Sequence, residues 1–250
     1  MRWTKVNQCL SAIRILLVYF VNWQREVTVE EWSGQKVVVK RNKSTKEFHE
    51  FLIIYAYSFI SMLLVHPSAP PAFSETMRNE GRGMRNALKN IGISTPELVS
   101  ISNADLVEEY IEGGDLYQAL ASGGDSALAN AAGGLTGRLH RAGYTFVDNK
   151  AQNYLVRGDS LVRTDLGFIK KSSSSYSRSM DIGSFLASVM DIGRYRKVEK
   201  AFYDGYLSEA GSGFTYLSLI IRNALSLGFS SDTKATFRNM LLNSSRLTVV

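Results

Sequence analysis

Four side chains between residues 148 and 165 have the types and the spacing that phosphoryl transfer from ATP requires. Asp148, Lys150 and Asn153 share one short segment after a predicted helix end, and Asp165 follows a predicted hairpin. One carboxylate can orient an attacking hydroxyl and accept its proton, while an amide oxygen and a second carboxylate can hold Mg²⁺. A lysine can balance charge on the transferred phosphoryl group. These residues therefore predict a site for magnesium-dependent phosphoryl chemistry.

The same stretch resembles the catalytic and magnesium-binding loops of the protein-kinase-like superfamily. Its first part matches the pattern Asp-x-Lys-x-x-Asn, and Thr164-Asp-Leu-Gly-Phe168 stands where that family has Asp-Phe-Gly. The resemblance implies catalytic roles for Asp148 and Lys150. It also implies metal binding by Asn153 and Asp165, with ATP and Mg²⁺ as cofactors.

Upstream segments resemble the part of that family that binds the ATP phosphates. Val37-Val-Val-Lys40 ends a predicted strand and is similar to the strand whose lysine contacts the α- and β-phosphates. In the polar helix predicted over 74–90, Glu80 is the carboxylate expected to pair with Lys40. Glu75 is the second choice, because it lies one turn too early in that helix to align well with the helix end at Gly92 and Pro96.

Residues 106–116 resemble the strand and hinge that join the two lobes of such proteins. The resemblance implies that adenine bonds to the backbone at Glu109 and Ile111, and that Asp115 reaches the ribose. Further along, Asp181 opens a segment that is similar to the helix whose buried aspartate braces the catalytic loop.

The sequence also departs from the common pattern of the superfamily. Phe146 replaces the histidine that usually precedes the catalytic aspartate by two residues, no glycine precedes Gly34, and the polar Glu108 stands just before the hinge. The segment between Asp165 and Asp181 is short and lacks Ala-Pro-Glu. In this short segment the chain resembles small atypical branches of the superfamily: archaeal-type small kinases, RIO-like kinases and lipopolysaccharide-core kinases. A pseudokinase that binds nucleotide or a protein partner without catalysis remains the alternative.

The elements needed to position these residues indicate an α+β chain. Valines alternate with polar residues around Ser33-Gly34, which predicts a hairpin over 26–40. Two more strands are expected at 98–102 and 105–111, followed by helices at 116–121, 127–141, 181–191, 195–210, 217–227 and 233–242. We therefore expect a two-lobed protein-kinase-like fold. A sheet-bearing N-terminal lobe covers 1–111, with a hydrophobic insertion at about 43–73 and the helix 74–90, and a helical C-terminal lobe covers 112–250.

Composition excludes several other classes of site. A chain of 250 residues with 45% hydrophobic and 21% charged residues is an ordinary globular one. Its single cysteine, Cys9, excludes an internal disulfide framework and a multi-cysteine zinc site. The net charge of +6 suits a phosphate-rich partner, but the cations do not cluster with aromatic residues, which argues against nucleic acid.

The nearly uncharged stretch 51–65 is too short to cross a membrane. Its fifteen residues would span about 22 Å as a helix, less than the roughly 30 Å of a hydrocarbon core. It is expected to be buried against the fold or to lie on a membrane surface. The predicted location is therefore cytoplasmic, with peripheral membrane association as an option.

Two further features are expected to be structural. His140 is interpreted as a packed residue at a helix end, and the serine-rich segment 170–178 as an exposed loop. The predicted function is transfer of the ATP γ-phosphoryl group to a hydroxyl acceptor on a protein Ser/Thr or on a sugar or lipid headgroup. The sequence does not identify this acceptor.

Overall fold

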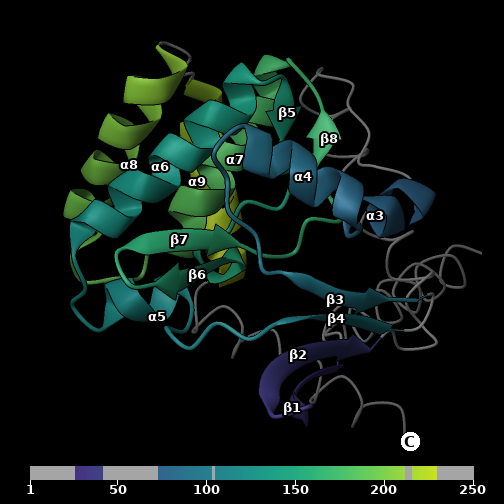
Figure 1. Cartoon of the computed structure of the whole chain (residues 1–250). Coiled ribbons are helices and arrows are strands. Elements are labelled where there is room, and N and C mark those ends of the chain that lie inside the picture. The colour runs from purple at the N-terminus through teal and green to yellow at the C-terminus, as the bar shows by residue number, and fades with distance from the viewer. Residues whose placement is uncertain (1–25, 42–72, 103–104, 212–215, 230–250) are drawn as a thin grey trace, which may run out of the picture.

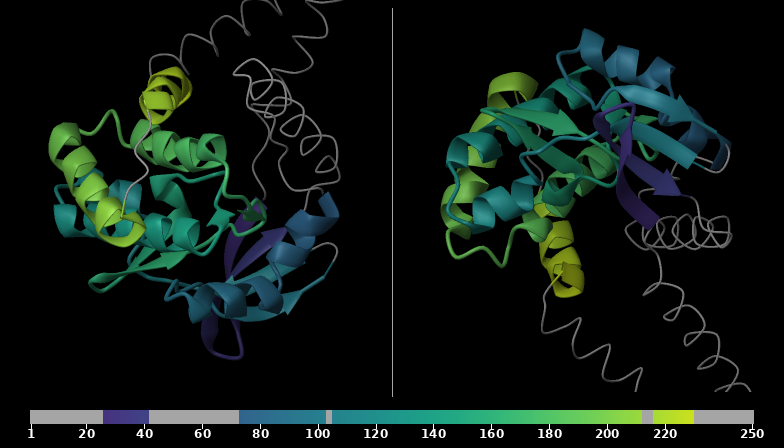
Figure 2. Two further views of the ribbon diagram at one scale, coloured as in Figure 1. Left: turned by 90° about the horizontal axis from the view of Figure 1, so that it is seen from above. Right: turned by 60° about the horizontal axis from the view of Figure 1, so that its bottom comes forward.

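The computed structural model describes residues 26–41, 73–102, 105–211 and 216–229. Figure 1 shows the sheet β1–β4 with helices α3 and α4 on one side of the molecule and helices α5–α9 on the other. The views in Figure 2 separate the same two groups, so the chain has two lobes. The expectations for the stretch 51–65, most of the insertion around it and the helix 233–242 lie outside the described residues.

The N-terminal lobe is built on a four-stranded antiparallel sheet. Strands β1 (Glu26–Trp32), β2 (Gln35–Arg41), β4 (Asp105–Glu109) and β3 (Leu98–Ile101) follow one another across it in that order. Ser33 and Gly34 both have positive φ, 52° and 79°, and form the two-residue turn that the hairpin pattern predicts.

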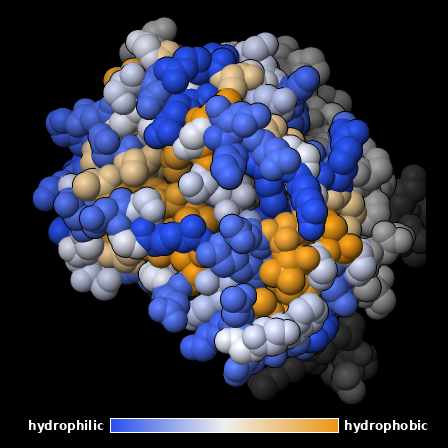
Figure 3. Space-filling model, viewed as in Figure 1, coloured by the Kyte–Doolittle hydropathy of each residue, from blue (hydrophilic) through white to orange (hydrophobic). Residues whose placement is uncertain are grey.

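One face of this sheet is partly apolar and open to solvent. Val99 and Ile101 on β3 are 47% and 38% exposed, and Figure 3 shows the apolar patch over this strand. The inner residues Val37, Val39 and Val107 instead form a small buried cluster. Alternation along the strands therefore sorts the side chains between the two faces.

The segment predicted as one helix over 74–90 is divided in two. Helix α3 (Phe73–Asn79) ends one residue before Glu80, and α4 (Arg82–Asn90) begins after Gly81, whose backbone is extended at φ −80° and ψ 177°. Glycine is a poor helix former and adopts extended backbone readily, which explains the break. Leu88 of α4 and Ile93 pack into the core of the helical lobe.

Short elements lie where the two lobes meet. Strand β5 (Tyr144–Thr145) pairs with β8 (Lys170–Lys171), and β6 (Tyr154–Arg157) pairs with β7 (Ser160–Arg163). A 3-10 turn, η1 (Ala151–Asn153), precedes β6. These elements frame the two loops that carry the predicted catalytic and metal-binding residues.

The C-terminal lobe contains helices α5 (Leu116–Ala121), α6 (Ser126–Arg141), α7 (Ser175–Ser188), α8 (Tyr195–Ala210) and α9 (Tyr216–Phe229). Helices α6 and α8 approach each other at glycines. A Cβ at Gly133 would fall on the carbonyl oxygen of Phe202, and one at Gly205 on that of Asn130. Glycine is therefore required for this helix pair to pack.

The start of α7 corrects the prediction for the serine-rich segment. Lys170 and Lys171 form β8, and α7 begins at Ser175, ahead of the predicted start at 181. Tyr176 is buried in a cluster with Val147, because apolar packing outweighs the local serine composition. In the part of the chain that the structure describes, no helix is both long enough and apolar enough to cross a membrane.

Candidate active site

The loop that contains Asp148 is held from behind by Asp181. The buried carboxylate of Asp181 accepts hydrogen bonds from the backbone N–H groups of Phe146 and Val147, each at 2.7 Å. Val147 has a φ of +66°, a conformation that a β-branched residue rarely adopts. These two bonds therefore hold the strained backbone directly before Asp148.

His140 and Asn149 complete the surroundings of Asp181. The His140 Nε2 lies 2.9 Å from the Asp181 Oδ2, and its Nδ1 lies 3.0 Å from the Tyr206 hydroxyl. The amide of Asn149 donates to the Asp181 carbonyl at 3.1 Å. His140 is therefore a packed residue at the end of α6, and it contacts the carboxylate that braces the loop.

Arg163 joins the two predicted loops, and sequence reasoning missed it. Its guanidinium is fully buried and donates to the carbonyl oxygens of Asp148 at 2.8 Å and Asn153 at 3.0 Å. The backbone N–H of Thr164 also donates to the Asn153 carbonyl at 3.0 Å. The residues just before Asp165 consequently lie beside the Asp148 loop. The available signal was an arginine that directly follows two apolar residues at the end of a short strand.

Within the Asp148 loop, the predicted side chains contact one another. The Lys150 Nζ lies 3.0 Å from the Asp148 Oδ2, and the Asn153 amide donates to the Asp148 carbonyl at 2.8 Å. Because that bond uses the Nδ2 of Asn153, its amide oxygen is the group available to accept or to bind a cation. The Asp148 carboxylate is partly exposed.

Asp165 lies in a turn that α3 holds in place. Its φ is +55° and its side chain is 47% exposed. The buried Asn79 amide donates to the carbonyl oxygens of Gly167 at 3.0 Å and Ile169 at 2.6 Å, while the Gly167 N–H donates to the Glu80 Oε1 at 3.2 Å. The last residues of α3 and the break that follows it therefore fix the turn that presents Asp165.

Lys40 connects the sheet to this turn. Its Nζ lies 2.8 Å from the Asp165 Oδ1, 2.8 Å from the Thr164 hydroxyl and 2.7 Å from the Glu108 Oε1. Burial lowers the pKa of Lys40, but the Asp165, Glu108 and Glu80 carboxylates raise it by more, so that its pKa is above the ordinary value. The lysine is therefore charged at neutral pH.

The ion pairs that Lys40 makes in this structure are with other carboxylates than Glu80, whose charge nevertheless acts on the lysine. The ion pairs of Lys40 go to Glu108 and Asp165, while Glu80 accepts the Gly167 N–H. Leu106 lies opposite Lys40 in the sheet register, so Glu108 projects from the same face, diagonally across from the lysine. Glu75, the second choice, lies 3.5 Å from Arg78 at the surface.

The predicted hinge residues lie at the edge of this site. The Glu109 N–H donates to the Glu97 carbonyl at 2.9 Å, and the Glu109 carboxylate pairs with Arg157 at 2.6 Å. Ile111 is buried. The Asp115 carboxylate accepts the Gln118 N–H at 2.9 Å and so caps α5, a use that the ribose prediction did not include.

The sheet also places apolar side chains on the face that carries Lys40. Val27 stands opposite Lys40 and Val29 opposite Val38, so all four share one face. Val27 and Val29 are 57% and 54% exposed. This face can therefore present both an apolar surface and a buried cation to one ligand.

Comparison with known proteins gives a structural match. A crystal structure of an aminoglycoside-3′-phosphotransferase of type VIII is similar, with a TM-score of 0.53 and 14% sequence identity. The match covers 80% of this chain and 88% of that chain. The chain has a protein-kinase-like fold. No family model matches the sequence, and no curated protein matches it either.

The match confirms the two-lobed α+β architecture expected from the sequence. The matched protein is an aminoglycoside phosphotransferase. It does not belong to the archaeal-type, RIO-like or lipopolysaccharide-core kinases that the short segment after Asp165 resembles. A kinase-like fold generally indicates phosphotransferase chemistry, but fold alone does not fix the acceptor.

The donor groups of the kinase-like site fit a magnesium ion that is held partly by its substrate. In the described residues, no group of three or more His, Cys, Asp or Glu side chains could bind a metal alone. Mg²⁺ commonly takes one or two carboxylates and completes its oxygen shell with phosphates and water. The Asp165 carboxylate and the Asn153 amide oxygen suit such a site.

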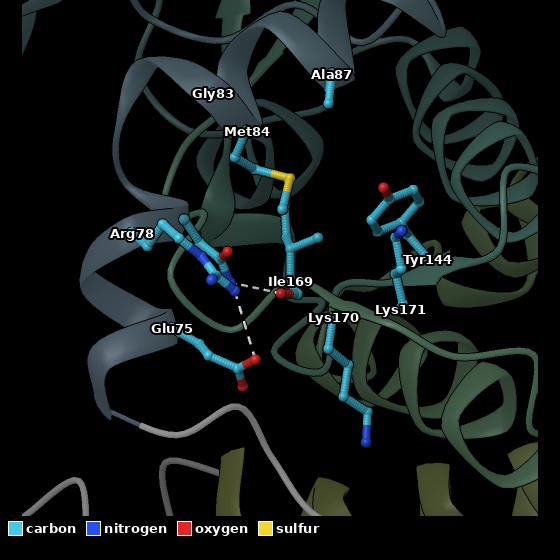
Figure 4. Close-up of a pocket in the computed structure, with 10 residues that line it drawn as sticks. Glu75, Arg78, Gly83, Met84, Ala87, Tyr144, Ile169, Lys170 and Lys171 are labelled. Carbon is cyan, nitrogen blue, oxygen red and sulfur yellow. Dashed lines mark hydrogen bonds and ion pairs between the residues drawn. The ribbon is translucent and has the colours of Figure 1, made fainter.

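A groove of 670 Å³ lies on the side of α3 and α4 that faces β5 and β8 (Figure 4). Met84 and Ile169 contribute apolar surface to it, and Arg78 and Lys171 add positive charge. Asn79 also lines this groove, and its amide bonds to the Ile169 carbonyl. The groove therefore adjoins the turn that carries Asp165.

Proposed function

We propose that this chain is an ATP-dependent phosphotransferase that moves the γ-phosphoryl group to a hydroxyl acceptor. The observation that supports this proposal best is the contact between the two lobes at Lys40 and Asp165. These side chains lie 2.8 Å apart, and Arg163 ties the backbone next to Asp165 to Asp148 and Asn153. A phosphate bound by Lys40 and a cation bound by Asp165 would therefore be neighbours.

Each side chain has a distinct role in this proposal. Asp148 orients the acceptor hydroxyl and takes its proton, while Lys150 balances the charge of the γ-phosphoryl group. Asn153 and Asp165 hold Mg²⁺, which supplies charge neutralisation at the phosphate oxygens. Lys40 holds the α- and β-phosphates. The 3.0 Å contact between Lys150 and Asp148 supports placing the lysine beside the carboxylate that orients the acceptor.

The nucleotide would lie against the face of the sheet that carries Lys40. Val27 and Val29 offer apolar contact to adenine, in keeping with their exposure. The backbone of Glu109 and Ile111 is assigned to adenine, and Asp115 to the ribose. Since the Glu109 N–H is taken by Glu97, the backbone group that Glu109 would offer is its carbonyl oxygen.

The test is a transfer assay with labelled ATP and Mg²⁺ on the purified full chain. Acceptors should include protein, lipid and sugar fractions and an aminoglycoside, since the matched structure is an aminoglycoside phosphotransferase. Asp148→Asn should reduce transfer about 10²–10⁴-fold, the usual contribution of a general base, while Mg²⁺·ATP binding stays unchanged. Asp159→Asn, in the exposed turn between β6 and β7, is the matched control.

Two results would contradict the proposal. Equal transfer by Asp148→Asn and the wild type would remove Asp148 from its role. Tight nucleotide binding without any turnover would favour the pseudokinase.

Contact of the stretch 51–65 with a membrane surface stays a prediction, and flotation with liposomes, with and without that stretch, tests it.

A further inference from the structure

The amino group of Lys40 is held by residues of the sheet and of the strand that precedes Asp165. It contacts Glu108 at 2.7 Å, the Thr164 hydroxyl at 2.8 Å and Asp165 at 2.8 Å. The Thr164 hydroxyl in turn donates to the Glu108 Oε1 at 3.0 Å. Glu108 and Thr164 therefore form a fixed pair of acceptors behind the lysine.

Glu108 is itself fixed from its other side. Its Oε2 accepts from the Arg85 Nη2 at 2.9 Å, and both residues are buried. Arg85 also donates to the carbonyl oxygens of Pro96 and Glu80. A buried carboxylate with a cation on each oxygen cannot swing away at low cost, because a cation would then lose its partner.

The electrostatics agree with this geometry. Burial raises the pKa of the Glu108 carboxyl, but Lys40 and Arg85 lower it by more. Glu108 is therefore a carboxylate at neutral pH, as a fixed partner for a charged lysine must be.

The carboxylate of Glu80, in the break between α3 and α4, lies 4.0 Å from the Arg85 Nη2 that Glu108 binds, and its closer contact is with another part of the site. Glu80 accepts the Gly167 N–H at 3.2 Å, next to Asn79, whose amide holds the Gly167 and Ile169 carbonyls. A Cβ on Gly167 would lie 2.7 Å from the Thr76 methyl group, so α3 packs directly on this turn. The end of α3 thus holds the backbone of the turn that carries Asp165.

We propose that Glu108 is the positioning residue for Lys40, and that Glu80 with Asn79 positions the turn of Asp165. This inference rests on the proposed function, since it concerns the same ATP site. Its consequence is a division of tasks. The contact of the lysine with phosphate depends on strand β4, whereas presentation of the metal ligand depends on α3.

The test compares Glu108→Gln with Glu80→Gln in the full chain, with the exposed Glu97→Gln as the matched control. Glu108→Gln should weaken Mg²⁺·ATP binding and raise its KM at least about tenfold, as expected when one partner of a buried charge pair is neutralised. Glu80→Gln should mainly lower kcat, with the nucleotide Kd within about threefold of the wild type. Glu108→Asp, which keeps the charge, should recover part of the affinity.

A second measurement needs neither ATP nor turnover. Labelling of Lys40 with an amine-reactive reagent, followed by mass spectrometry, reports how tightly the lysine is held. Glu108→Gln should increase the labelling rate at least about fivefold, and Glu80→Gln should have a smaller effect, because Glu108 is the one of these two carboxylates that forms an ion pair with the amine at 2.7 Å. Circular dichroism establishes that each variant is folded. If Glu108→Gln does not fold, Glu108→Asp should still show faster labelling.

The outcomes separate this inference from the proposed function. Weaker nucleotide binding or faster labelling in Glu80→Gln than in Glu108→Gln would overturn the inference, even if transfer were demonstrated. Lack of ATP binding by the wild type, together with the expected labelling pattern, would instead contradict the proposed function and leave the role of Glu108 standing.

Discussion

The two sides of the candidate site are held together by different kinds of interaction. On the helical side, the buried side chains Asp181 and Arg163 bond to the backbone of the Asp148 loop. On the sheet side, Lys40 is held through side chains, with Glu108 and Thr164 around it. The residues that hold the Asp148 loop therefore do not need to touch the substrate. Lys40, in contrast, belongs both to the buried contacts with Glu108 and Thr164 and to the proposed phosphate site.

On the helical side, the residues that stabilise the loop are different from those that would bind the ligand. On the sheet side, Lys40 has both tasks. A backbone loop can be braced from behind without using the groups that face the ligand. A side chain that binds phosphate must exchange part of its own charge contacts for the ligand, so its partners influence affinity directly. Changes on the helical side should therefore lower stability and transfer together, whereas changes on the sheet side should alter nucleotide affinity first.

The largest effect is expected from Asp181→Asn. The change replaces an acceptor oxygen by an N–H₂ group in front of the Phe146 and Val147 N–H groups. The free energy of unfolding in urea should fall by about 3–5 kcal/mol, and transfer should fall at least about 100-fold. Asp191→Asn, an exposed aspartate that accepts from Tyr117, serves as the control. Wild-type stability in Asp181→Asn would refute the proposed brace.

A smaller effect is expected where α3 touches the turn of Asp165. In Gly167→Ala the new methyl group would lie 2.7 Å from the Thr76 Cγ2. Overpacking of this kind costs about 1–3 kcal/mol, and the displaced turn should lower kcat. Adding Thr76→Ser, which removes that methyl group, should restore part of both. A double variant no better than Gly167→Ala alone would exclude this contact as the cause.

Acid titration tests the charge of Glu108. Its folded-state pKa is lowered, because Lys40 and Arg85 outweigh burial. Its contribution to stability is therefore present above the unfolded pKa of about 4.3, and is lost as pH falls through the lower folded pKa. Wild type should lose stability below about pH 4 more steeply than Glu108→Gln, measured by urea unfolding from pH 6 to 3. Parallel curves would contradict this.

The smallest effect is expected from an exposed ion pair that differs by only 0.1 Å in length from the buried one. Lys200 and Asp204 lie 2.6 Å apart on α8, compared with 2.7 Å for Lys40 and Glu108. Because water screens the exposed pair, Lys200→Gln should change the free energy of unfolding by less than about 0.5 kcal/mol. A loss as large as that of Glu108→Gln would show that burial does not decide the strength of these pairs.

Local patterns were sufficient for much of the fold and for part of the site. The turn at Ser33-Gly34 and the helix Leu116–Ala121 were predicted at their observed positions, because a tight turn and an amphipathic segment depend on neighbouring residues. The close spacing of Asp148 and Asn153 indicated that they share one loop. The start of α7 was missed, since burial of Tyr176 depends on distant parts of the chain.

The partners of the site residues could not be predicted in the same way. Asn79 reaches a carbonyl 88 positions away, and Lys40 reaches Thr164 across 124 positions. Spacing along the early helix favoured Glu80 over Glu75, but it gave no reason to consider a carboxylate on a strand. The choice of Glu108 depends on the register between β2 and β4, which places it diagonally across from Lys40.

The sequence by itself determined which residue types are present, their order along the chain and the local elements that carry them. Those features indicated a two-lobed kinase-like chain and pointed to Asp148, Asn153 and Asp165. Only the tertiary structure decided that Lys40 pairs with Glu108 and that Arg163 joins the two loops. The reason is physical: a buried charge must be neutralised by whichever group the packed fold brings within reach, and that distance is set by packing between remote segments.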